Sequence, residues 1–174
     1  MEEGENEMIE EVKDKNALNL DLSETARTKI WVNGDNRRVL ELNLTDLGIM
    51  GRAKDAKDKL DELQAEANEL ASADVPDSIE SDEDEKKIDV VIERFSSIDK
   101  KMRELVDGIF DFPVCDVCCD GGSMYDPING QYRYEYIIDK VMALYGDQWE
   151  KESKLRKQNI EKHTSKYTKS RKKK

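Results

Sequence analysis

The most constraining feature of this sequence is an apolar stripe with helical spacing between residues 86 and 109. Most members of the stripe are three or four residues apart: Ile88, Val91, Ile92, Phe95, Ile98, Met102, Leu105 and Ile109. This spacing places them on one side of an α-helix and leaves charged residues on the other side. The pattern predicts a helix of about 24 residues, roughly 36 Å long, which ends before Pro113.

A second apolar stripe precedes the first and predicts a partner helix. Its members are Ile49, Met50, Ala53, Ala56, Leu60, Leu63, Ala67 and Leu70. The helix should begin near Thr45 or Asp46, whose side chains can cap it, although Gly48 allows a start a few residues later. The segment 72–85 between the stripes has seven acids and no base, which is typical of a solvated linker. We expect the two helices to form an antiparallel pair.

Residues 28–44 alternate between apolar and polar side chains, as the strands of a β-hairpin do. The first strand carries Ile30 and Val32 on one face and Trp31 on the other, and the second strand has leucine at alternate positions. Asn33-Gly34-Asp35-Asn36 would form the turn, because these residues tolerate a positive φ. A two-stranded hairpin is marginally stable alone, so helices or another chain must cover it.

A third helix is expected to begin near Gln131. Its apolar side would consist of Tyr134, Ile137, Ile138, Val141, Met142, Leu144 and Tyr145. The segment 112–130 before it contains Gly121-Gly122 and Asp126-Pro127, which mark turns in a loop. The whole pattern predicts a mostly α fold with a small β-hairpin (α+β) and three main helices.

The composition leaves little material for a large core. Only 37% of the residues are hydrophobic, 40% are charged, and the net charge is −11. We therefore expect a flexible acidic lead at 1–22, a helical domain at 23–150 and a basic tail at 151–174, with both ends disordered. No apolar run approaches the ~20 residues of a membrane span, and the acidic start lacks the apolar region of a signal peptide. These features predict a cytosolic protein with no membrane partner.

Three cysteines, Cys115, Cys118 and Cys119, form the one cluster that could suit a metal or redox site. A structural zinc ion takes four Cys or His ligands, and the single histidine, His163, lies far along the chain. A redox CxxC pair normally begins a helix in a βαβ unit, which this sequence does not predict. Packed or bystander thiols are the simplest interpretation, with metal binding and redox chemistry as alternatives. Catalytic and nucleotide-binding motifs are absent from the sequence, so we expect a binding protein with no cofactor, not an enzyme.

The tail at 151–174 has 11 Lys or Arg residues and two acids. It could remain solvated or pair with the acidic body, it could dock on an acidic protein, or it could contact nucleic acid with Tyr167 stacking on a base. The rest of the chain is strongly acidic and repels nucleic acid, so nucleic acid is the least expected partner.

Three stretches of the chain resemble one known family: WVNGDNRRVLELNLTDLGIMGR, VVIERFSSIDKKMRELVDGIFDFPVCDVCCDGGSMYDPINGQYRYEYIIDKVMALY and KHTSKYTK. The family is encoded beside the tail genes of phages and prophages of Gram-positive bacteria and is similar to siphovirus tail assembly chaperones. The resemblance covers roughly residues 28–168. It implies a protein of the host cytoplasm that binds the tape measure protein, helps to recruit tail tube protein during morphogenesis, and is not part of the finished virion. A structural tail or neck protein, and a nucleic-acid-binding packaging or regulatory factor, are the alternatives.

We expect the partner-binding face on the hairpin and the second helix, with Trp31, Phe95, Met102 and Phe110 as contact residues. Large aromatic side chains and methionines often anchor adaptable binding surfaces. All four could instead belong to the core, and the core is the favoured interpretation for Phe95 and Met102 because they lie on the apolar stripe. Self-association of the chain also remains open.

Overall fold

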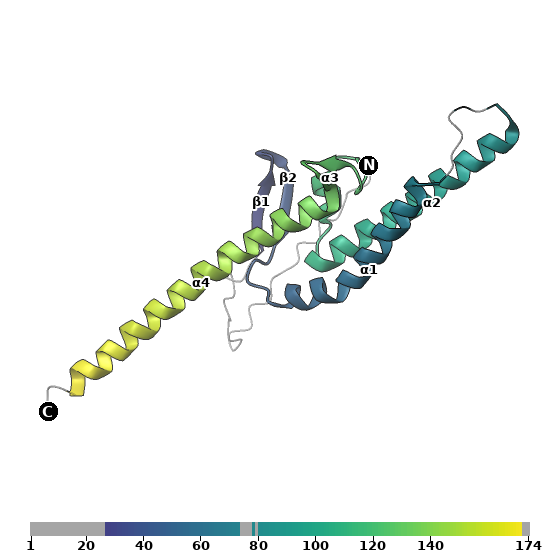
Figure 1. Cartoon of the computed structure of the whole chain (residues 1–174). Coiled ribbons are helices and arrows are strands. Elements are labelled where there is room, and N and C mark those ends of the chain that lie inside the picture. The colour runs from purple at the N-terminus through teal and green to yellow at the C-terminus, as the bar shows by residue number, and fades with distance from the viewer. Residues whose placement is uncertain (1–26, 74–77, 79, 172–174) are drawn as a thin grey trace, which may run out of the picture.

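The structure, a computed structural model, describes residues 27–73, 78 and 80–171, with side chains as far as residue 162. In chain order the elements are β1 (Thr28–Val32), β2 (Asp35–Leu42), α1 (Gly48–Ala71), α2 (Asp82–Phe110), α3 (Val114–Cys119), β3 (Pro127–Ile128), β4 (Gln131–Tyr132) and α4 (Arg133–Arg171) (Figure 1). The predicted α+β class is therefore confirmed, with three long helices and a small hairpin. The acidic lead at 1–22 lies outside the described residues.

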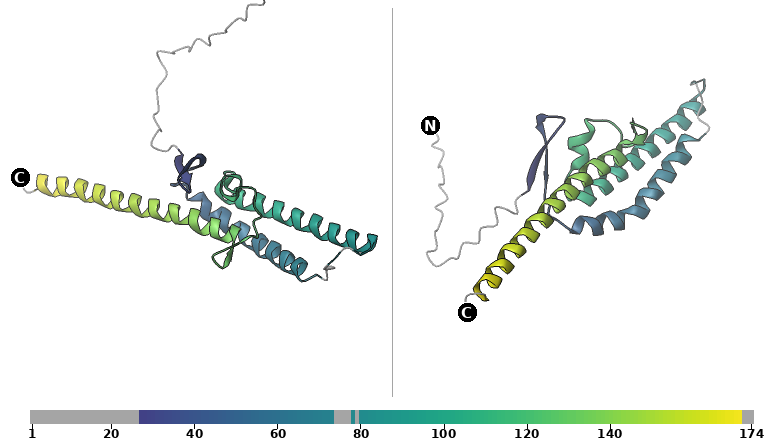
Figure 2. Two further views of the ribbon diagram at one scale, coloured as in Figure 1. Left: turned by 90° about the horizontal axis from the view of Figure 1, so that it is seen from above. Right: turned by 60° about the vertical axis from the view of Figure 1, so that its left-hand side comes forward.

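Helices α1 and α2 lie side by side and antiparallel, as Figures 1 and 2 show. The C-terminal half of α2 is the centre of the core, where Ile98, Met102, Val106 and Ile109 are buried. The N-terminal half of α2 extends past the core, so its apolar residues are less covered. The apolar stripe therefore predicts the helix correctly, but only its second half is fully packed.

The β1–β2 hairpin has the alternation of apolar and polar side chains that the sequence predicts. Asn33 and Gly34 form the turn, and both have a positive φ, 56° and 74°. Ile30 lies opposite Leu40, and Thr28 lies opposite Leu42, in an antiparallel register that shifts after Trp31. Because Leu40 and Leu42 are buried in the common core, one face of the hairpin is fixed against the helices.

The segment between α2 and α4, expected to be a loop, contains additional structure. Asp111 adopts a left-handed conformation after the end of α2, and the short helix α3 follows. A second small hairpin, β3–β4, turns at Asn129 and Gly130, both with a positive φ. Tyrosines of the segment between α3 and α4 pack against α1 and α2. For example, the Tyr125 hydroxyl donates a hydrogen bond to the Leu63 carbonyl at 3.2 Å. The segment thus joins α4 to α1 and α2.

The start of α1 agrees with the later of the two predicted starts, and the predicted start of α2 is wrong by a few residues. Helix α1 begins at Gly48, because the Asp46 carboxylate accepts a hydrogen bond from the Gly48 backbone N–H at 2.7 Å and terminates the preceding turn. Helix α2 begins at Asp82 with Ser81 as its N-cap, so the linker is shorter than 72–85. The last acids of that segment occupy the first turn of α2, where carboxylates favour the positive end of the helix dipole.

Helix α4 is much longer than predicted. It continues from Arg133 to Arg171, so the segment 151–171 is helical and the prediction of a disordered basic tail is wrong for that range. This part of α4 extends well beyond the rest of the described chain (Figures 1 and 2). Residues 172–174 lie outside the described part. None of the helices in that part is long and apolar enough to cross a membrane.

Candidate functional site

The side of the β1–β2 hairpin that faces away from the core is the most exposed apolar surface on a rigid element. We define the outer hairpin face as Lys29, Trp31, Val39 and Glu41. Trp31 lies opposite Val39 in the register, and the Trp31 side chain is 63% exposed. The Lys29 ammonium and the Glu41 carboxylate form an exposed ion pair at 3.3 Å beside it. An indole between an apolar residue and a polar rim resembles the anchor of a protein interface.

The outer hairpin face is held in a fixed orientation by an arginine on the second strand. The Arg38 guanidinium donates hydrogen bonds to the carbonyls of Val117 and Cys118 at the end of α3, each at 2.9 Å. These carbonyls have no partner inside so short a helix, so the two bonds stabilise α3 and attach β2 to it. The hairpin is therefore fastened by its buried leucines and by Arg38, and Trp31 is presented on a supported strand.

The structure does not bring the four predicted contact residues together. Met102 is 0% exposed and Phe110 is 3% exposed, so the prediction that they contact a partner is wrong for this conformation. Phe110 stacks on Tyr145 of α4 with ring centroids 6.4 Å apart. Phe95 is half-buried and packs against the Tyr125 ring at 5.7 Å. Trp31 alone among the four is exposed on a surface.

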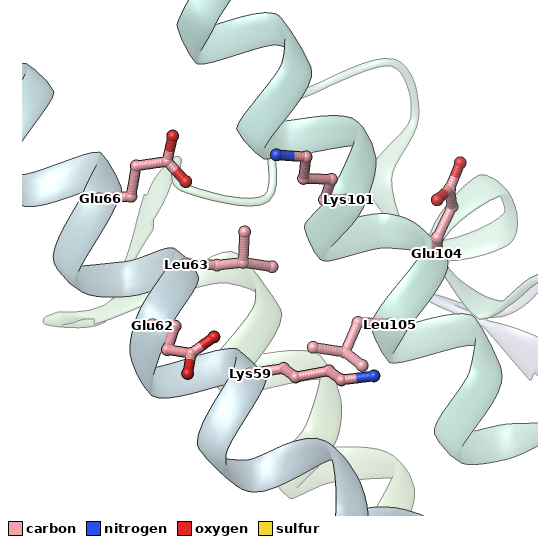
Figure 3. Close-up of a pocket in the computed structure, with 7 residues that line it drawn as sticks. All are labelled: Lys59, Glu62, Leu63, Glu66, Lys101, Glu104 and Leu105. Carbon is pink, nitrogen blue, oxygen red and sulfur yellow. The ribbon is translucent and has the colours of Figure 1, made fainter.

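The two largest of the hollows described here lie on other faces of the molecule. One, of about 550 Å³, lies between α1 and α2. Leu63 and Leu105 point into this space and are surrounded by charged side chains (Figure 3). The other, of about 440 Å³, lies between the hairpin and the first half of α4 and is more apolar, with Leu40, Ile137 and Val141 in its lining. Sequence reasoning did not predict either hollow, because each requires knowing which helix faces are apposed.

A partly buried polar cluster connects α2 to the segment after α3. The Asp99 carboxylate accepts hydrogen bonds from the Ser123 hydroxyl at 2.7 Å, the Met124 backbone N–H at 2.6 Å and the Arg103 guanidinium at 2.9 Å. Burial raises the pKa of this carboxyl, but the three hydrogen bonds favour its charged form more strongly, so the pKa is lowered overall. The Arg103 guanidinium also donates to the Gly122 carbonyl. These contacts are structural, since they hold a backbone turn, and Asp99 and Arg103 also line a hollow of about 300 Å³.

The thiols gather on α3 and are reduced. Cys115 and Cys119 are buried, and Cys118 is half-buried. A hydrogen bond from Cys115 and the nearby guanidiniums of Arg103 and Arg133 lower the pKa of Cys119 to about 7, against the opposing effect of burial. Burial raises the pKa of Cys118 to about 11. The Cys119 sulfur lies 3.4 Å from the Met124 sulfur, which is a packing contact inside the core.

Over the described ranges, no group of three or more Cys, His, Asp or Glu residues is placed to hold a metal ion. Comparisons of the chain with protein-family models, with curated proteins and with solved structures find no match. What the chain does must therefore be inferred from its own surfaces. The arrangement of those surfaces, with a rigid exposed indole on a charged helical body, suits protein binding.

Proposed function

We propose that this chain is a tail assembly chaperone that binds the tape measure protein and assists the recruitment of tail tube protein in the host cytoplasm. The observation that carries the proposal is the outer hairpin face, where Trp31 is 63% exposed on a strand whose other face is packed. The resemblance of residues 28–168 to tail chaperones is the reason for naming the tape measure protein as the client, that is, the protein that the chaperone binds. The outer hairpin face supplies a place for that client to bind.

Covering the outer hairpin face would release substantial free energy. A tryptophan side chain buries on the order of 200 Å², so covering the exposed share of Trp31 corresponds to roughly 3 kcal/mol at ~25 cal/mol per Å². A long helical client presents apolar residues repeatedly along its length. The net charge of −11 keeps the chaperone itself dispersed while this apolar residue remains accessible.

The test is co-expression with the tape measure protein from the same tail gene cluster, followed by affinity purification. Trp31→Ala should lose the tape measure protein while its unfolding temperature stays close to that of the wild type. Met50→Ala is the matched control, because Met50 is also an exposed apolar residue, 54% exposed, but lies on α1. Met50→Ala should retain the client.

If Trp31→Ala retained the tape measure protein as well as the wild type does, the outer hairpin face would be rejected as the binding site. Absence of any tail protein from the wild-type purification would reject the chaperone function itself. If the chain were found in purified phage particles, it would be a structural tail or neck protein instead.

A further inference from the structure

The part of α4 that follows Glu150 is rich in charge. We define the basic arm as residues 151–162, which include five Lys or Arg residues and two Glu residues. All side chains between 151 and 162 are exposed, and among them Leu155 is 52% exposed. A charged helix whose side chains are exposed is usually marginal in water. The basic arm therefore has the character of an element that a partner completes.

The N-terminal end of α2 has the opposite charge. We define the acidic tip as residues 80–90, which contain six acids and two lysines. Four acids occupy the first turn of α2, and Glu83, Glu85 and Asp89 are exposed. Two large apolar residues are exposed at or just beyond the acidic tip, Val90 at 55% and Ile92 at 57%. The acidic tip thus combines negative charge with apolar area on one helix.

The acidic tip and the basic arm lie at opposite ends of an elongated molecule. In Figure 1 the start of α2 is at the upper right and the end of α4 is at the lower left, and both views of Figure 2 agree. The arm of one molecule therefore cannot reach the tip of the same molecule in this conformation. It can reach the tip of a second molecule.

We propose that the basic arm of one copy of this chain docks on the acidic tip of another copy. Lysines and arginines of the arm would face carboxylates of the tip, and Leu155 would pack near Val90 and Ile92. Exposed ion pairs contribute little singly, so several of them together with the apolar contact must provide the affinity. Because the two surfaces differ, a pair joined by one such contact still has one free arm and one free tip, which either meet each other or bind further copies.

This self-association does not depend on the tape measure protein, so it can hold or fail separately from the proposed function. The first measurement is sedimentation velocity of the nuclease-treated full chain over a range of concentrations. The average mass should rise with concentration above that of the monomer, and the association should weaken by about tenfold or more between roughly 0.05 and 0.5 M NaCl, because salt screens exposed charges. A wild-type chain that stays monomeric at low salt and high concentration would overturn the proposal. So would association that requires added nucleic acid.

Charge reversal identifies the two surfaces. The arm variant Lys151→Glu/Lys154→Glu/Arg156→Glu/Lys157→Glu changes the net charge of residues 151–162 from +3 to −5, and the tip variant Glu83→Lys/Glu85→Lys/Asp89→Lys changes that of residues 80–90 from −4 to +2. Each variant should be monomeric alone, because its arm and its tip then carry the same sign of charge. Mixing the two variants should restore association, since each then meets its opposite. The control Asp55→Lys/Asp58→Lys/Asp116→Lys changes the net charge as much as the tip variant does, at exposed sites outside both surfaces, and should associate like the wild type.

Circular dichroism and thermal unfolding establish that each variant is folded before it is sedimented. Persistent association of the tip variant alone would overturn the proposal. Failure of the mixture to associate, when both variants are folded, would overturn it as well.

Discussion

The centre of the molecule and its two helical extensions are stabilised by different interactions. In the centre, α2, α3, α4 and the hairpin share one core, in which Met102, Phe110 and Tyr145 are almost fully buried. In the extensions, the acidic tip and the basic arm expose nearly all of their side chains. The centre therefore determines the shape of the molecule and presents Trp31, whereas the extensions carry exposed charge toward other molecules.

Arginines contribute differently in the two regions. In the centre, Arg52 donates to the Ile109 carbonyl at 2.8 Å and Arg133 donates to the Cys119 carbonyl at 2.8 Å, so each arginine satisfies a helix end. In the basic arm, Arg156 is exposed. Removing a central arginine should therefore lower stability, whereas removing an arm arginine should mainly change association.

The largest expected effect is in the core. Phe110→Ala should lower the free energy of unfolding by about 3–5 kcal/mol, because it leaves a cavity against Tyr145. Urea unfolding measures it, and Leu155→Ala in the basic arm is the control, with a change within ~0.5 kcal/mol. A loss below ~1 kcal/mol for Phe110→Ala would mean that the side chain is not packed as described. Phe110 would then again be a candidate for contact with a partner.

The next effect is at the partly buried carboxylate of Asp99. Asp99→Asn should lower the free energy of unfolding by about 2–3 kcal/mol, because the Arg103 guanidinium and the Met124 N–H lose a charged acceptor. The same urea experiment measures this change. Asp89→Asn on the exposed side of α2 is the matched control and should be nearly neutral.

The lowered pKa of Asp99 also predicts a dependence of stability on pH. A carboxyl whose pKa is lower in the folded state stabilises that state above its unfolded pKa, and this contribution is lost as the pH falls through the folded pKa. The wild type should therefore lose stability on acidification below about pH 4 more steeply than Asp99→Asn. Parallel curves of unfolding free energy against pH would show that Asp99 does not titrate as described.

A smaller effect is expected for the thiols. Cys119→Ala should lower the free energy of unfolding by about 1–2 kcal/mol through lost packing against Met124, and client binding should be unchanged. Cys118→Ala, at a half-buried site, should have less effect on stability. Stoichiometric zinc in protein purified without added metal, and its loss in either variant, would show instead that the cluster binds a metal.

The smallest effect on folding is expected from removal of the basic arm. Deleting residues 151–174 should change the free energy of unfolding by less than about 0.5 kcal/mol, because none of the side chains from 151 to 162 is buried. Circular dichroism should show only the helix signal of the missing segment disappearing. Cooperative loss of the remaining helices would show that the arm is part of the core.

Local patterns were sufficient to predict the hairpin and the first two helices. The alternation around Trp31 and the stripe ending at Ile109 each lie within one element, and no distant contact is needed to interpret them. The β3–β4 hairpin was missed although Asn129-Gly130 is the same signal as Asn33-Gly34, because strands of two residues are too short to show alternation. The continuation of α4 was missed because a helix without an apolar side gives no periodicity, although its Lys, Glu and Arg residues are good helix formers.

The candidate site was only partly predictable. Trp31 was expected to point away from the packed face of the hairpin, and it is exposed. Met102 and Val90 lie on the same helix, yet one is buried and the other is exposed. The segment after α3 contacts α2 at Phe95, through Tyr125, and at Asp99, and Val90 lies before these contacts. Exposure depends on these distant contacts, which sequence spacing within α2 does not encode.

The most direct test of the proposed binding site is hydrogen–deuterium exchange on the free chain and on its complex with the tape measure protein. Peptides covering Thr28–Leu42 should exchange more slowly in the complex, because the client would cover the outer hairpin face around Trp31. Peptides from the first half of α1, on another side of the molecule, should exchange at the same rate in both samples. Unchanged exchange across Thr28–Leu42 in a stable complex would contradict the assignment of the outer hairpin face as the client site.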